Sequence, residues 1–345
     1  MHSYLLPPVF NTVLQLPCAG SLTLVTHEVM KHFLLLFLLT LAGCVGTRST
    51  IAPRIAEGYC APPVAYRYDA GLIPLPSLEA ALTPELLNRY PRRNLLTANA
   101  VGIIPMLQEL VVLEAKSKQA PNNQTSTAIL QLRQRILTQV VLVGTTIASV
   151  AAELDCEGER AEQVAGYLSN RDNQRTQRLN VLSIAVGAAS GIGTTLFEKK
   201  AAQYTLGIGG GVLAAGLGLL TLTGSHTAEF THPRNLLAEV WTGAPTASTF
   251  PPSLWCMLTE PAFSNSGQTS IAYNTRQRWQ HYSQLADPDS KASQQLVRLL
   301  FGAGGRYSAE QLTVRANMLN ELQSAVHLLN QELQGLLLVL SETPR

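Results

Sequence analysis

The sequence predicts a mainly α protein, an elongated bundle of long helices that carries a glycine-rich apolar helical hairpin. Residues 180–224 hold two uncharged apolar runs of helical length, one on each side of a short charged segment. No proline occurs from Ser126 to His232, and apolar residues recur there at spacings of three and four. Residues 308–342 repeat leucine at threes, fours and sevens, which is typical of a helix that packs along another helix.

At the amino terminus, the sequence changes character at Met30. Residues 1–29 are poor in charge and contain three prolines. Residues 30–43 have the build of a signal peptide, with a short positive segment, a dense apolar core and a small-residue cleavage site. Because a signal peptide belongs at the start of a chain, we expect translation to begin at Met30 and residues 1–29 to be a start-site artefact.

The end of this segment, Leu41-Ala42-Gly43-Cys44, resembles the lipobox of bacterial lipoprotein precursors. The resemblance implies cleavage before Cys44, attachment of diacylglycerol to its sulfur and acylation, for example by palmitate, of the new amino terminus. Several acyl chains on one residue anchor a protein stably. The alternative is a plain secretory signal with a chance cysteine. Val45 stands where an aspartate would retain a lipoprotein in the inner membrane, so the resemblance implies an outer-membrane protein that faces the periplasm or the cell surface.

Three further cysteines, Cys60, Cys156 and Cys256, follow the predicted anchor. An exported chain meets an oxidising compartment, so we expect one disulfide and one free thiol, with all three pairings open. No CxxC or HExxH motif occurs, and we therefore expect no metal site.

The predicted mature chain starts with residues 44–82, which are rich in proline, glycine and alanine and suit an extended tether. A helical body over residues 83–345 follows. Thr83 and Pro84 supply a cap and a first-turn proline for its first helix. A second helix is expected over residues 94–118, kinked or divided at Pro105.

A long helical rod is expected from Ser126 onward, about 70 to 100 Å if straight and interrupted near Gly158. Its acidic cluster lies on two helix faces, so we interpret these side chains as solvated. The cluster comprises Glu153, Asp155, Glu157 and Glu159.

The rod runs into the hairpin of residues 180–224. The first apolar run, residues 180–197, spans about 27 Å as a helix, close to the thickness of the hydrocarbon core of a bilayer. A charged tip with Glu198, Lys199 and Lys200 separates it from the second run. That run holds six glycines, which would cost an isolated exposed helix about 6 kcal/mol.

Two glycine pairs, Gly187 with Gly191 and Gly207 with Gly211, have the i, i+4 spacing that puts both members on one helix face. Small residues on one face let two helix backbones approach closely, as at membrane helix interfaces. The sequence leaves two interpretations open. The hairpin is buried in a bundle or an oligomer core, or it enters a bilayer.

After the hairpin, a loop-rich segment is expected over residues 231–264, with Trp241 and Trp255 as packing anchors. Helices over residues 269–285 and 288–301, a glycine turn and one closing helix over residues 308–342 complete the predicted body. Ser308 and Gln311 have the spacing of a capping box for that last helix.

For function, the sequence favours a non-enzymatic role. It contains no GxSxG or SxxK motif and no acid pair suited to general acid–base work. The net charge is only +2, so no nucleic-acid footprint is expected, and neither a cofactor nor a small-molecule substrate is indicated. We expect a lipid-anchored cell-envelope protein with a structural or assembly role, acting through homo-oligomers or an envelope protein partner. The alternative is a component of a pore or transport conduit whose hairpin enters a bilayer.

Overall fold

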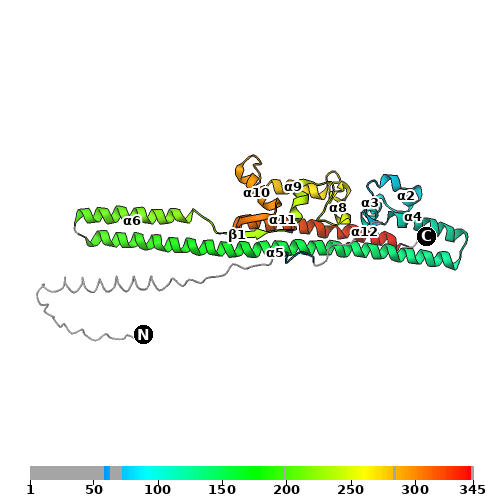
Figure 1. Cartoon of the computed structure of the whole chain (residues 1–345), viewed down its shortest axis with the longest axis horizontal. Helices are drawn as coiled ribbons and strands as arrows, with labels where there is room; N and C mark the ends of the chain where they lie inside the picture. The colour runs from blue at the N-terminus through cyan, green and yellow to red at the C-terminus, as the bar shows by residue number, and fades with distance from the viewer. Residues whose placement is uncertain (1–57, 63–71, 198, 283–284, 343–345) are drawn as a thin grey trace, which may run out of the picture. The chain divides into compact units, whose positions relative to one another are not determined.

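A computed structural model describes residues 58–62, 72–197, 199–282 and 285–342 of the chain. The chain divides into two units, Met1–Ile51 and Ala52–Arg345, and the described residues all belong to the second. The signal peptide, the lipobox and the start-site prediction all lie outside the described residues. Within them, helices account for most of the chain and one two-stranded sheet for the rest of the regular structure, so the predicted mainly α fold is confirmed (Figure 1).

The part of the predicted tether that the structure describes is docked on the body from Leu72 onward. Leu78 is buried, and the Leu75 amide donates to Oδ1 of Asn99 at 3.0 Å. A short 3₁₀ turn, η2 (Glu79–Ala81), follows. A Cβ built on Gly102, whose φ is +82°, would lie 2.0 Å from the Leu72 carbonyl oxygen. The prediction of an extended tether is therefore wrong for residues 72–82, because their apolar side chains find a surface to cover.

The first helices begin and end where the sequence indicates. Helix α2 (Pro84–Arg89) is capped by Thr83, whose side chain accepts from the Leu86 amide. Helix α3 (Arg92–Val101) and helix α4 (Ile104–Gln119) meet at an angle of 119°, with a proline in the first turn of α4. The predicted division at Pro105 is confirmed.

Helix α5 (Asn123–Leu196) is one continuous helix of 74 residues, about 110 Å at about 1.5 Å per residue. Asn122 caps its start by accepting from the Thr125 amide. The interruption predicted near Gly158 is wrong. Gly158 is buried within the helix, and a Cβ there would lie 2.7 Å from Oδ1 of Asn320. This glycine serves close helix packing rather than a break.

Helix α6 (Lys200–Thr221) runs back along the last part of α5, so the helical hairpin is confirmed (Figure 1). The chain then enters strand β1 (Thr227–Thr231). This strand pairs in antiparallel register with β2 (Gly304–Ser308), Phe230 lying opposite Gly305. The sheet was missed from the sequence, where the glycines around residue 304 indicated a turn. Gly304 has a φ of +101°, and a Cβ at this position would clash with the Phe230 carbonyl oxygen, so the pairing requires glycine here.

Small helices fill the segment between the strands. They are α7 (Leu236–Thr242), α8 (Pro252–Thr259), η3 (Pro261–Phe263), α9 (Ile271–Gln280) and α10 (Lys291–Phe301). The loop-rich segment expected over residues 231–264 thus holds two α-helices, and Trp255 is buried in it as expected.

The carboxyl-terminal helices α11 (Ala309–Leu328) and α12 (Asn330–Ser341) lie along α5 (Figure 1). The capping box of Ser308 and Gln311 is confirmed. The predicted single helix is divided at Leu329, and both parts bury leucines against the bundle.

A disulfide joins Cys60 to Cys156 across a sequence separation of 96 residues and ties the chain ahead of residue 72 to the middle of α5. Cys256 remains a free thiol. Burial raises its pKa to about 11, so it stays protonated near neutral pH. Of the three pairings that the sequence left open, the structure forms Cys60–Cys156.

Buried ion pairs connect α5 to the sheet and to the segment after it. The Arg160 guanidinium lies 2.7 Å from Oε2 of Glu157, donates to the Thr231 carbonyl at 2.8 Å and covers the Phe230 ring. Glu153 pairs with Arg234 at 2.7 Å. The interpretation of the acidic cluster as solvated is wrong for Glu153 and Glu157, which are both buried.

Candidate functional site: an exposed apolar helical hairpin

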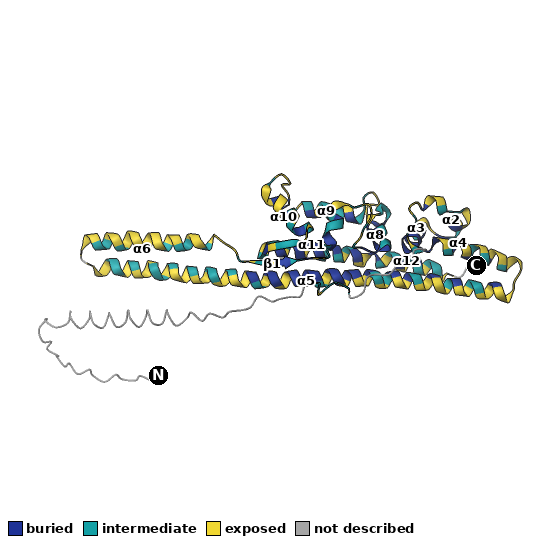
Figure 2. Cartoon of the chain, viewed as in Figure 1, coloured by how far each residue is buried: buried dark blue, intermediate teal, exposed yellow. Residues whose placement is uncertain are grey.

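The hairpin of α5 and α6 has almost no buried residue. No residue of α5 after Leu168 is buried, and Gly210 is the one buried residue of α6 (Figure 2). Large apolar side chains stand exposed on both helices: Val181, Leu182, Ile184, Ile192, Leu196, Tyr204, Ile208, Val212, Leu213, Leu219 and Leu220. Soluble monomers rarely expose a continuous apolar surface of this extent, so this surface needs an occupant.

Close contacts of small side chains hold the two helices together. A Cβ built on Gly210 would lie 1.6 Å from Oγ of Ser190, and one built on Gly193 would lie 3.2 Å from the Leu206 side chain. The hydroxyl of Ser183 also donates to the Ala214 carbonyl across the pair at 2.9 Å. The helices therefore touch mainly through glycine, serine and alanine, with the Leu206 side chain beside Gly193, while most of the larger apolar side chains are exposed.

The predicted packing glycines are mostly not those that make this contact. A Cβ on Gly187, Gly191 or Gly211 would meet nothing within 4 Å, and one on Gly207 would lie 3.5 Å from Thr194. Within one chain, the prediction is therefore wrong for the first three. These three glycines are exposed and face open space instead.

The contact at Gly210 gives a direct test. We expect Gly210→Ala to lower protection of the α6 amides from hydrogen exchange about tenfold, because the added methyl forces the helices apart. Gly209→Ala is the matched control, since a Cβ there meets nothing within 4 Å. That control should raise protection, because alanine favours an exposed helix by about 1 kcal/mol over glycine. Equal effects of the two substitutions would contradict the close approach.

Charged residues mark both ends of the hairpin. Arg171, Arg175 and Arg178 recur on α5 just before the first apolar run, and Lys199 and Lys200 stand at the tip. By length and composition, α5 and α6 are both long and apolar enough to cross a membrane, and the bent pair α3 and α4 would pass if taken as one span. The hairpin thus presents an uncharged band between two charged ends.

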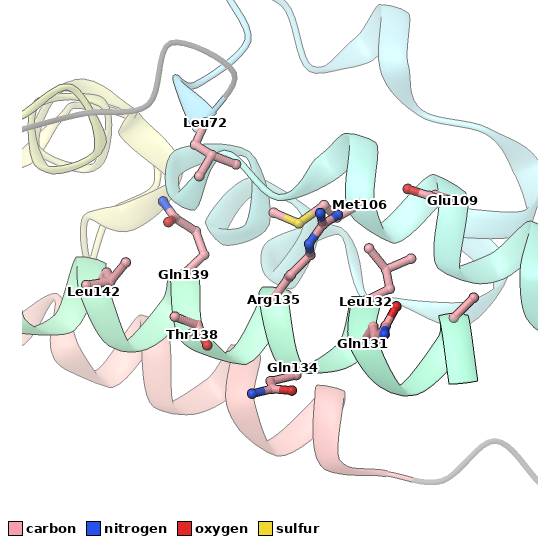
Figure 3. Close-up of a pocket in the computed structure, with 11 residues that line it drawn as sticks. Leu72, Met106, Glu109, Gln131, Leu132, Gln134, Arg135, Thr138, Gln139 and Leu142 are labelled. Carbon is pink, nitrogen blue, oxygen red and sulfur yellow. The ribbon is translucent and has the colours of Figure 1, made fainter. Parts of the chain in front are cut away.

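A second feature is a groove of about 790 Å³ between α4 and α5, beside Leu72 (Figure 3). Met106 and the long side chain of Arg135 lie over it, and three glutamines line its α5 side. Its other polar residues are Glu109 and Thr138, so the groove offers hydrogen bonds and two opposite charges to a ligand.

The buried polar residues near the sheet are used for packing. His232 lies 3.0 Å from the Tyr307 hydroxyl, which in turn donates to the Leu299 carbonyl. Burial lowers the pKa of His232 to about 3, so its ring is neutral. Over the described part of the chain, no three His, Cys, Asp or Glu side chains gather closely enough to hold a metal ion.

The hairpin is therefore the feature of the described chain that packing does not explain. The sequence had indicated it from its lack of charge, whereas its outward exposure is visible only in the structure. In the comparisons with known proteins, no family model, no curated protein and no solved structure matches this chain.

Proposed function

We propose that this chain is a non-enzymatic lipoprotein of the bacterial cell envelope, at the outer membrane, whose hairpin enters the bilayer that holds its lipid anchor. The observation that carries the proposal is the exposed apolar surface of α6. Only 6% of the most apolar 18-residue stretch of this helix is buried. The 22 residues of α6 span about 33 Å, which matches the hydrocarbon core of a bilayer.

The disulfide supports insertion into the same bilayer as the anchor. Sixteen residues of chain separate Cys44 from Cys60, and they reach at most about 55 Å. Cys156, to which Cys60 is bonded, lies about 35 Å along α5 from Leu179, where the apolar run begins. With α5 upright and its hairpin inserted, the anchor at Cys44 therefore reaches the same membrane surface.

The test compares two identical substitutions at equally exposed valines. Val212 in the middle of α6 and Val112 on α4 are both 66% exposed. In chains that carry Cys44→Ala behind a cleavable secretion signal, we expect Val212→Lys to reduce co-flotation with phospholipid vesicles roughly a hundredfold. A lysine at the centre of a bilayer costs about 2.5–3.5 kcal/mol. Val112→Lys should float like the unsubstituted chain.

A second candidate function, assembly through the hairpin, is favoured by the exposed small residues Gly187, Gly191 and Gly211. Small residues on an outer helix face suit close approach of a second hairpin. The same variants separate the two functions. If the chain ignores vesicles but forms oligomers in buffer that Val212→Lys dissociates and Val112→Lys does not, the hairpin is an oligomer core and insertion is wrong.

A further inference from the structure

A small polar cavity lies at the base of the hairpin, where α6 ends beside α5. It measures about 330 Å³. Asp172, Arg175 and Thr176 line it from α5, and Thr221 and Ser225 line it from the returning chain. The cavity therefore combines one positive group, one negative group and several hydroxyls.

Among the described residues, the Arg175 guanidinium forms no ion pair with a carboxylate. The Arg175 guanidinium donates to the carbonyls of Gly224 and Leu220, the latter at 3.4 Å. These bonds fix its plane against the carboxyl end of α6 and leave Nε–H without a partner among the described residues. A guanidinium held by neutral carbonyls keeps its full charge and its affinity for a phosphate group.

The negative group of the cavity, the Asp172 carboxylate, uses only one of its two oxygens in hydrogen bonds within the described chain. Oδ1 of Asp172 accepts from the His226 amide at 2.8 Å and lies 2.6 Å from Nδ1 of its ring. Within the described chain, Oδ2 makes no hydrogen bond. This oxygen is therefore available to accept from an ammonium group in the cavity.

The position of the cavity matches the surface of a bilayer. Leu179, Leu220 and Leu222 also line it, and they belong to the ends of the two apolar runs. When the hairpin is inserted, the cavity lies where the hydrocarbon gives way to headgroups. A ligand that enters it from the membrane therefore arrives with its polar end first.

We propose that this cavity binds the zwitterionic phosphoethanolamine headgroup of a phospholipid, with the phosphate on Arg175 and the ammonium on Asp172. The two residues are three apart on one helix, so their side chains are neighbours on the same face, as the two charges of the headgroup are. Hydroxyls of Thr176 and Ser225 add donors for the phosphate oxygens, whereas the Thr221 hydroxyl already donates to the Gly218 carbonyl at 2.6 Å. The inference rests on the proposed insertion of the hairpin.

The headgroup choice separates a built site from simple attraction to an anionic surface. Phosphatidylethanolamine and phosphatidylcholine are both neutral overall, but the quaternary ammonium of choline cannot donate a hydrogen bond. A general surface potential acts on all basic residues near the membrane and gives no preference between these two lipids. A cavity that holds both charged groups prefers the ethanolamine headgroup.

The experiment measures binding of the Cys44→Ala chain to vesicles of phosphatidylcholine alone and to vesicles with half of it replaced by phosphatidylethanolamine. Asp172→Asn should lower the preference for the mixed vesicles about tenfold, as expected for loss of a charge-assisted hydrogen bond to the ammonium, and Arg175→Gln should weaken binding to both kinds of vesicle, because both lipids carry the phosphate. Arg178→Gln is the matched control, since Arg178 does not line the cavity, and it should leave the preference unchanged. Because each variant is compared with the parent chain in the same vesicles, effects of lipid packing cancel.

Binding to phosphatidylcholine vesicles should be the same for the parent chain, Asp172→Asn and Arg178→Gln, which shows that the hairpin still forms. A parent chain that binds neither kind of vesicle contradicts insertion itself. A chain that binds both, with a preference that Asp172→Asn does not change, contradicts the headgroup site alone. Titration of the vesicle-free chain with soluble glycerophosphoethanolamine distinguishes the source. Saturable binding there, lost in Arg175→Gln, together with no vesicle preference, would overturn the lipid assignment in favour of a soluble ligand.

Discussion

Replacing both bonded cysteines, Cys60→Ser with Cys156→Ser, should lower the free energy of unfolding by about 4 to 5 kcal/mol. The disulfide closes a loop of 96 residues. In the chain-entropy description, opening a loop of that length restores a large number of unfolded conformations. Urea denaturation monitored by circular dichroism gives the change directly.

The control for this variant is Cys256→Ala, which removes the free thiol. Cys256 packs at the edge of the core and makes no disulfide, so this change should cost far less. Equal denaturation midpoints of the double serine variant and the parent chain would contradict the role of the disulfide in stability.

The same double substitution has a consequence for the proposed anchor. With the disulfide open, the next described residue docked on the body is Leu72, and the chain between it and Cys44 grows to 28 residues. Its maximum reach rises from about 55 Å to about 95 Å. With the proposed anchor at Cys44, the disulfide would restrict how far α5 can stand from the membrane surface, in addition to its expected effect on stability.

Local signals in the sequence were sufficient for the helices. Thr83 and Ser308 cap α2 and α11 as their side chains indicated, and Pro105 divides α3 from α4. Two uncharged apolar runs within residues 180–224, separated by a charged tip, identified the hairpin. In each case the determinant lies within a few residues of the structure that it specifies, so a single sequence contains it.

Contacts between distant segments could not be predicted in this way. Strands β1 and β2 each have five residues and lie more than 70 residues apart; β1 alternates polar and apolar residues only over this short length, and β2 begins with two glycines, which indicated a turn. Glu153 is buried because Arg234, 81 residues away, pairs with it. The glycine spacing identified helix faces, but only the structure shows that Gly210 faces the partner helix while Gly211 faces outward.

Glu157 and Arg160 form a buried ion pair, and removing the charge of Glu157 should destabilise the fold strongly. Both side chains are less than a tenth exposed. Arg315 on α11 is fully buried nearby, and burial lowers its pKa to about 10, while the charge of Glu157 opposes that shift. In Glu157→Gln, two buried guanidinium groups lose their nearby negative charge. Leaving a buried charge without its partner costs about 3–5 kcal/mol, so we expect a loss of that size in the free energy of unfolding.

Glu159→Gln is the matched control, because this residue lies two positions further along α5 and is exposed. An exposed glutamate contributes little, so its removal should change the free energy of unfolding by less than about 0.5 kcal/mol. If both variants unfold at the same urea concentration, Glu157 is not neutralising the buried arginines. A loss confined to Glu157→Gln would establish that this charge holds β1 and α11 on the helix that carries the hairpin, because Arg160 donates to Thr231 of β1 and Arg315 belongs to α11.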